Sequence, residues 1–187
     1  MMFDSGRPGD PATVIRLNPK TGERSMDQLV WGLLPHGADP AKSPRPLHAR
    51  AETVATLPMF ADAFRRRRAI VPVDVISMSG SIGENDGRKF RLSRADGDPM
   101  ALAGLWESYV WPGGRIERSF CVVTVAANEG IAPVHDRMPV VLERPDWPLW
   151  LGEVDGDTAT LLRAAASGVL RLASAGARRR AKGGRHV

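Results

Sequence analysis

The sequence has little cysteine, little histidine and no long apolar run. Cys121 is the only cysteine among 187 residues, so an intrachain disulfide is excluded and the redox compartment is left unconstrained. His36 and His48 have no Cys, Asp or Glu at ligand spacing, so we expect no metal and no cofactor. No apolar stretch approaches the roughly 18 residues of a membrane-spanning helix, and the N-terminal MMFDSGRPGD lacks the apolar core of a signal peptide. We therefore expect a cytoplasmic protein without membrane contact.

Positive charge exceeds negative charge in the chain. There are 26 Lys and Arg against 21 Asp and Glu, which gives a net charge of +5 and an isoelectric point near 10.1. This balance favours anionic partners such as nucleic acid. Much of the excess lies near the C-terminus, at Arg178, Arg179, Arg180, Lys182 and Arg185. We expect these residues to form a solvated, disordered tail.

Short strands separated by turns dominate the predicted secondary structure. Apolar alternation and short apolar runs predict strands at 13–17, 25–34, 69–76, 89–92, 100–109, 118–126 and 139–142. Helices are predicted at 51–68, 145–151 and 158–166. Many short strands with few helices favour an α+β fold, a central antiparallel barrel-like β-sheet with peripheral helices. The expected divisions are an irregular segment at 1–12, one domain at 13–166 and a basic, disordered tail at 167–187.

Five short segments occur in an order and spacing that resemble one family. They are Trp31-Gly32-Leu33-Leu34-Pro35, Ala49-Arg50-Ala51-Glu52-Thr53, Arg67-Arg68-Ala69-Ile70-Val71-Pro72-Val73-Asp74, Ala103-Gly104-Leu105-Trp106-Glu107 and His135-Asp136-Arg137-Met138-Pro139. Each segment is weak alone, but together they cover residues 14–151. The sequence is similar to the SOS-response-associated peptidase (SRAP) family, whose members process abasic sites in single-stranded DNA. The resemblance implies an SRAP-like fold, and single-stranded DNA with abasic sites as the partner.

The resemblance also implies a covalent chemistry. Family members begin Met-Cys, and removal of the Met exposes an amine and a thiol that close a thiazolidine ring on the abasic aldehyde. An Asn before the Ala-Arg motif helps to orient the ring, while a Glu and the His of the His-Asp-Arg-Met-Pro motif transfer protons. The same cysteine and Glu are linked to removal of a leader peptide. The family-level assignment is therefore a hydrolase of the peptidase class, or an enzyme resembling an abasic-site lyase.

This chain departs from the family pattern at the reactive positions. Met2 stands where the cysteine is expected, His48 where the Asn is expected, and Met78 where the acid is expected. Gly37 replaces a second Trp, and Cys121 lies in the middle of a strand without an α-amine to share. The resemblance also begins late, which fits either a start assigned inside a longer gene or a truncated, degenerate paralogue. The losses far from the start favour degeneracy, so we expect impaired catalysis.

Three residues remain as candidates for the family's site. His135 is the one retained catalytic candidate, either as a proton shuttle near the DNA sugar or as an ordinary hydrogen-bonded loop residue. Arg50 and Arg137 are predicted to bind DNA phosphates through the guanidinium fork. The alternative for these two arginines is a salt bridge to Glu52 or Asp136.

Aromatic and basic side chains outside that set also have two interpretations each. Trp31, beside a proline-rich loop, is predicted to bind DNA as a stacking platform for a base, or else to pack in the core. Core packing is favoured for Trp106. The run Arg65 to Arg68 is a solvated helix end or a contact to the DNA backbone.

Three functions follow from these features. The first is a repair enzyme that acts covalently on abasic DNA, which requires an N-terminal cysteine that the sequence does not show. The second is a non-catalytic paralogue that binds single-stranded DNA. The third is a decaying paralogue or interaction protein with no role in nucleic-acid binding.

Overall fold

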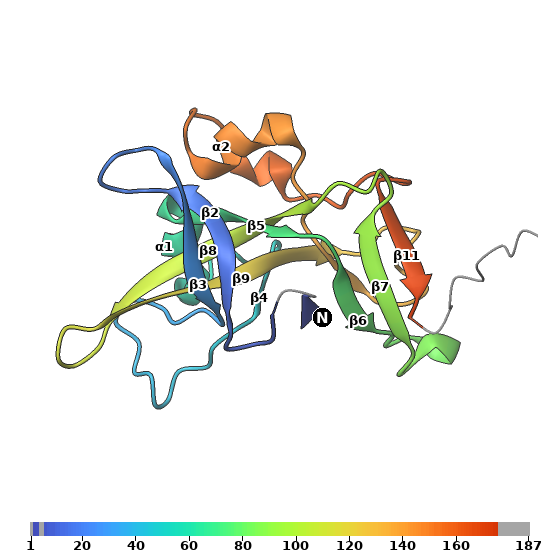
Figure 1. Ribbon diagram of the computed structural model, residues 1–187, viewed down its shortest axis with the longest axis horizontal. Helices are drawn as coiled ribbons and strands as arrows, with labels where there is room; N and C mark the ends of the chain where they lie inside the picture. Colours follow the sequence, from blue (N-terminus) through green and yellow to red (C-terminus); the bar gives the residue numbers. More distant parts are fainter. Residues whose placement is uncertain (1, 4–5, 176–187) are drawn as a thin grey trace, which may run out of the picture.

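The computed structural model describes residues 2–3 and 6–175, and a closed β-barrel lies at its centre (Figure 1). The barrel strands are β2 (Pro11–Leu17), β3 (Arg24–Trp31), β5 (Arg68–Val73), β8 (Met100–Val110) and β9 (Ile116–Ala126). They pair in the order β9-β3-β2-β5-β8, and β8 pairs with β9 to close the ring. All these pairings are antiparallel except that of β3 with β9, which is parallel. The predicted α+β fold with a barrel-like sheet is confirmed, with one parallel joint.

A second, antiparallel sheet lies beside the barrel, on the right in Figure 1. Its strands, in spatial order, are β1 (Met2–Phe3), β6 (Ile76–Ser79), β7 (Lys89–Arg94) and β11 (Leu170–Ser174). Two segments predicted to be irregular therefore contribute strands, and for these residues the prediction was wrong. The backbone groups of β1 pair with the edge of β6, and those of β11 pair with the edge of β7. These contacts join segments far apart in the sequence, so a local sequence pattern does not predict them. Residues 176–187, which hold most of the predicted basic tail, lie outside the described residues.

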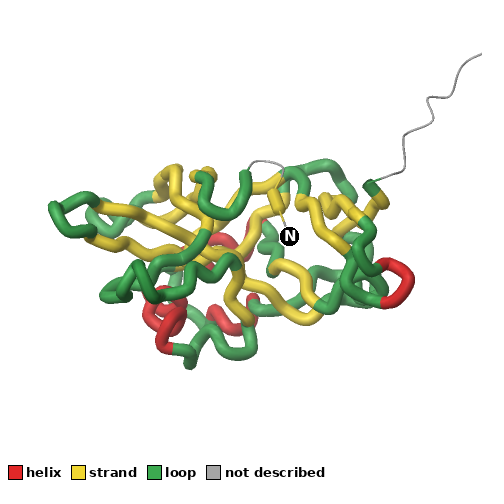
Figure 2. Tube along the Cα trace, turned by 90° about the horizontal axis from the view of Figure 1, so that it is seen from below, coloured by secondary structure: helices red, strands yellow, loops and turns green. Residues whose placement is uncertain are grey.

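Helices are short and few compared with the strands and loops, as the red segments of Figure 2 show. They are α1 (Pro58–Arg66) and α2 (Trp147–Leu151), with 3₁₀ turns η1 (Gly83–Asn85), η2 (Arg144–Asp146) and η3 (Thr158–Leu161). Both α-helices pack against β5. Among the described residues, no helix is long and apolar enough to cross a membrane.

Several predicted boundaries differ from the structure. The predicted helix at 51–68 begins only at Pro58, because a proline inside a helix lacks the N–H donor and clashes with the carbonyl four residues earlier. The predicted helix at 158–166 is limited to one 3₁₀ turn. The predicted strand at 139–142 is displaced to β10 (Arg137–Pro139), followed by an isolated bridge between Leu102 and Val141.

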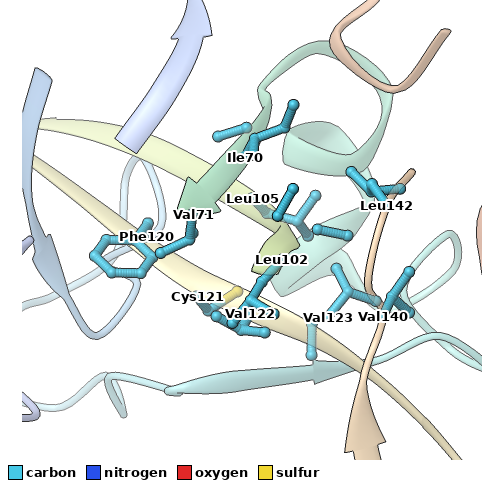
Figure 3. Packing of buried hydrophobic residues seen from close by; sticks show 14 of the residues in the cluster. Ile70, Val71, Leu102, Leu105, Phe120, Cys121, Val122, Val123, Val140 and Leu142 are labelled. Atoms are coloured by element: carbon cyan, nitrogen blue, oxygen red, sulfur yellow. The ribbon is translucent and has the colours of Figure 1, made fainter. Parts of the chain in front are cut away.

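The core is built from β8 and β9, which are buried on both faces. Residues 100–107 and 119–125 are continuously buried, as expected when one face points into the barrel and the other is covered. Figure 3 shows Val71, Leu102, Phe120 and Val122 packed together in this core. Gly104 allows β5 and β9 to approach β8 closely, since a Cβ there would lie 3.0 Å from the Val71 side chain.

Candidate functional site

Strand β9 joins the two arginine motifs that are far apart in the sequence. Strand β4 (His48–Arg50) runs parallel to residues 122–124 of β9, with Arg50 opposite Thr124. Strand β10 runs antiparallel to residues 124–126, with Arg137 opposite Ala126 and Pro139 opposite Thr124. The Arg50 and Arg137 motifs therefore meet at the C-terminal end of β9.

Arg137 is held by an ion pair and by the backbone. Its guanidinium donates to both carboxylate oxygens of Glu52, at 2.6 and 2.9 Å, and to the carbonyl of Thr124 at 2.7 Å. These hydrogen bonds lower the pKa of the Glu52 carboxyl to about 2. The Arg137 side chain is only 15% exposed, and its Nε is buried without a hydrogen-bond partner in the described part of the chain. The structure thus has the salt bridge to Glu52 that was the alternative for Arg137, and phosphate binding by Arg137 stays a prediction.

Arg50 differs from Arg137 in having no such partner. Its side chain is exposed, and it makes no hydrogen bond or ion pair with any other described residue. Its positive charge acts on Glu52 only at a distance. A free guanidinium beside an ion-paired one leaves donors directed to solvent at this end of β9. Phosphate binding by Arg50 likewise stays a prediction, with no salt bridge competing for the side chain.

His135 lies in the loop that leads into β10. Its Nδ1 accepts a hydrogen bond from the backbone N–H of Arg137 at 3.0 Å, which orients the ring. Asp136 Oδ1 lies 3.1 Å from the same nitrogen, so a protonated ring would gain an ion pair there. The side chain is 28% exposed. The site geometry therefore gives His135 an oriented ring, and both interpretations of its role remain.

His48 is half-buried next to Trp31, with the two ring centroids 6.1 Å apart in an edge-to-face arrangement. Its Nε2 has no hydrogen-bond partner among the described residues. Burial lowers the pKa of the imidazole to about 4, and the charge of His135 acts in the same direction. His48 is therefore neutral at pH 7, and it lies within electrostatic reach of His135.

The two methionines at lost family positions are neighbours. In the second sheet, Met2 of β1 lies opposite Ser77 of β6, one residue before Met78, whose own side chain is buried. The loop after β6 then reaches the segment before His135, since the Ser81 N–H donates to the Val134 carbonyl. The fold therefore connects the β1–β6 edge to the segment before His135, and the residue expected as the acid is a buried methionine.

Trp31 does not offer a ring face for stacking. Its side chain is 1% exposed, its indole Nε1 donates to the Leu47 carbonyl, and its ring stacks on Phe120. The structure thus has the core packing that was the alternative for Trp31, and DNA stacking by this residue stays a prediction. Trp106 is buried as expected, with the Arg16 guanidinium 4.4 Å from its ring centroid.

The only cysteine is not available for chemistry. Cys121 is fully buried in the middle of β9, opposite Leu105 of β8, and burial raises the pKa of its thiol. A thiolate is the reactive form of cysteine, so this residue is inert. No group of three or more His, Cys, Asp or Glu side chains among the described residues is arranged to hold a metal ion.

Sequence reasoning missed Thr124 entirely. Its carbonyl accepts from both the Arg137 guanidinium and the Ala51 N–H, which ties the two arginine motifs to one atom. A threonine in an apolar strand carries no signal of this function, because the contact depends on which two strands flank it.

Comparisons with known proteins agree with the order of these motifs. A family model described as "SOS response associated peptidase (SRAP)" matches residues 5–175. The chain is 31% identical over 152 residues to the abasic site processing protein YedK of Escherichia coli, covering 81% of this chain and 66% of that protein. It is 29% identical over 133 residues to the abasic site processing protein YoqW of Bacillus subtilis, covering 71% of this chain and 59% of that one. The chain thus spans roughly three-fifths of the length of these relatives.

Solved structures resemble the fold as well. A crystal structure of a protein from Bordetella bronchiseptica superposes with a TM-score of 0.77 at 27% identity, covering 90% of this chain and 85% of that chain. A crystal structure of a protein from Bacteroides thetaiotaomicron gives the same TM-score at 20% identity, covering 89% of this chain and 74% of that chain. The second likeness concerns the fold alone.

Proposed function

This chain belongs to the SOS response associated peptidase (SRAP) family, and we propose from that premise that it is a cytoplasmic DNA-repair protein that binds single-stranded DNA at abasic sites. The relatives named above as abasic site processing proteins support the choice of substrate. The observation that carries the proposal is Arg50, which is exposed and has no ion-pair partner among residues 2–3 and 6–175, beside Arg137 and the oriented ring of His135. A guanidinium in this state is suited to a phosphate oxygen pair.

We propose further that the covalent chemistry of the family is impaired in this chain. A stable thiazolidine needs an amine and a thiol on adjacent carbons, and Cys121, which is buried in β9, has no α-amine to share. The positions of the Asn and the acid hold His48 and Met78, which cannot replace an amide and a carboxylate in those roles. The same observations favour a second candidate function, a paralogue that binds single-stranded DNA without catalysis.

One titration tests the proposal, with abasic single-stranded, intact single-stranded and duplex oligonucleotides as probes at several salt concentrations. We expect preference for the single strands, with affinity falling as salt rises by a log–log slope of about −0.7 per neutralised phosphate. Arg50→Ala should weaken binding and flatten the slope by about 0.7 because one phosphate contact is lost. Arg171→Ala, an exposed arginine on β11, is the matched control. If both variants bind alike, Arg50 does not contact the strand.

A denaturing gel of the same abasic complex separates the two candidate functions. We expect no heat-stable crosslinked band, and at most a weak band trapped by borohydride, because an amine alone forms a reversible Schiff base. A stable band without reductant would show that another nucleophile replaces the cysteine. Binding without any trapped band would assign the non-catalytic function.

A further inference from the structure

A cleft of about 690 Å³ lies away from the candidate site. It is enclosed by the β2–β3 turn, the C-terminal end of α1, strand β8 and the end of α2, on the left and top of Figure 1. Glu107 in its wall pairs with Ser119 of β9, which at about 3.4 Å per residue is roughly 17 Å along the strand from Thr124. Leu17 and Leu151 give the cleft an apolar surface. A cavity of this size is typical of small-molecule sites.

Positive charge exceeds negative charge in the lining of this cleft. Arg65 to Arg68 all line it, and Asp62 and Glu107 are its only carboxylates. Arg67 uses both carboxylates, with hydrogen bonds to Asp62 and, at 2.8 Å, to Glu107. Arg65 and Arg66 reach only Asp62, at 3.6 and 3.4 Å, and their side chains are 68% and 71% exposed. These two guanidinium groups therefore retain most of their donors.

Arg68 is a half-buried cation with no carboxylate partner among the described residues. It donates only to backbone carbonyls, those of Phe64, Arg65 and Trp150. Burial lowers the pKa of its guanidinium. Gly152 leaves the space beside its Nη2 open, since a Cβ there would lie 3.0 Å from that nitrogen. An anion in the cleft would supply the counter-charge that the protein does not.

We propose that this cleft binds a small phosphorylated ligand of nucleotide size, with its phosphate among Arg65, Arg66 and Arg68. The carbon skeleton of the ligand lies against Leu17 and Leu151. Basic residues at a helix C-terminus also stabilise the helix dipole. That effect explains the charge of Arg65 and Arg66, but it explains neither the apolar cavity nor the unpaired charge of Arg68. The ligand is a free nucleotide or the terminal phosphate of a DNA strand, and the site is independent of Arg50.

Isothermal titration calorimetry with 2′-deoxyadenosine 5′-monophosphate tests this inference, with deoxyadenosine as the probe that lacks the phosphate. We expect the monophosphate to bind and deoxyadenosine not to bind. The double variant Arg65→Ala/Arg66→Ala should weaken binding about tenfold or more, because charge-assisted hydrogen bonds to the phosphate are lost. Both side chains are largely exposed, so the variant should fold, and an unchanged thermal midpoint checks this.

The control is Arg88→Ala/Arg171→Ala, which removes two exposed positive charges elsewhere and should bind like the parent. An equal loss of affinity in both double variants would mean that only net charge matters, and it would overturn the site. The site would also be overturned if Arg65→Ala/Arg66→Ala kept the affinity of the parent, or if the monophosphate did not bind. Competition with a short oligothymidine identifies the source of the phosphate. If the 5′-phosphorylated strand displaces the monophosphate and the 5′-hydroxyl strand does not, the ligand is the phosphate at a strand end. If neither strand displaces it, the ligand is a free nucleotide.

Discussion

The two arginine-rich regions of this protein differ in how their charges are compensated. At the end of β9, Arg137 is paired bidentately with Glu52 and Arg50 is free. Around the end of α1, three of four consecutive arginines share two carboxylates, and Arg68 donates only to backbone carbonyls. The larger local excess of positive charge therefore lies in the region for which the family resemblance implies no site residue. Motifs locate residues, whereas the charge available to a ligand depends on tertiary partners.

The largest expected effect is a loss of folding stability on replacing Arg67, the arginine of the α1 region that pairs with a buried carboxylate. Glu107 is 4% exposed, and Arg67 is its only ion-pair partner among the described residues. Arg67→Ala leaves that carboxylate buried and unpaired, so we expect the free energy of unfolding to fall by about 3 kcal/mol. Urea denaturation at pH 7 measures this.

Arg65→Ala is the control for that experiment, because its exposed side chain should change the free energy of unfolding by less than about 0.5 kcal/mol. A similarly small effect of Arg67→Ala would mean that water solvates Glu107, and the contrast between the two arginines would disappear.

The second effect concerns His48 at the candidate site. Its pKa is about 4 in the folded protein and 6.5 in the unfolded chain, so the unfolded state binds the proton first as the pH falls. This contribution to stability is fully present above pH 6.5 and is lost as the pH falls towards 4. Between pH 7 and pH 5 the loss should be about 2 kcal/mol.

His48→Asn restores the residue type expected from the family and removes this titration. Its urea midpoint should therefore change less between pH 7 and pH 5 than that of the parent. Glu52, whose pKa is about 2, does not titrate in this window. Equal pH dependence in parent and variant would show that His48 is solvated or paired.

The barrel could be predicted from the sequence because its strands are local patterns bounded by turns. The apolar runs of β8 and β9 predict their burial, and Pro58 marks a helix start that the apolar spacing obscured. The contributions of β1 and β11 could not be predicted, since both depend on partner strands more than 70 residues away. The same holds for the burial of Trp31, since its ring lies against His48 of β4 and Phe120 of β9, which are distant in the sequence.

The sequence indicates which residues form the candidate site, but it does not indicate which carboxylate pairs with Arg137. Glu52 and Asp136 were equal alternatives for Arg137 in the sequence, because both lie in the motifs. The register of β4 and β10 on β9 decides in favour of Glu52. Spacing along the chain carries no information on that register.

The smallest effect tests whether Glu52 competes with DNA for Arg137. Phosphate and carboxylate bind the same guanidinium fork, so a strand that contacts Arg137 must displace or share with Glu52. Glu52→Gln keeps the size of the side chain and removes its charge. We expect single-stranded DNA to bind a few-fold more tightly, with the log–log salt slope steeper by about 0.7 because one more phosphate is neutralised.

Glu23→Gln, which changes an exposed acid in the β2–β3 turn, controls for net charge. Weaker binding by Glu52→Gln would instead mean that Glu52 orients Arg137 for the strand, and an equal gain in both variants would leave Arg137 outside the DNA contact.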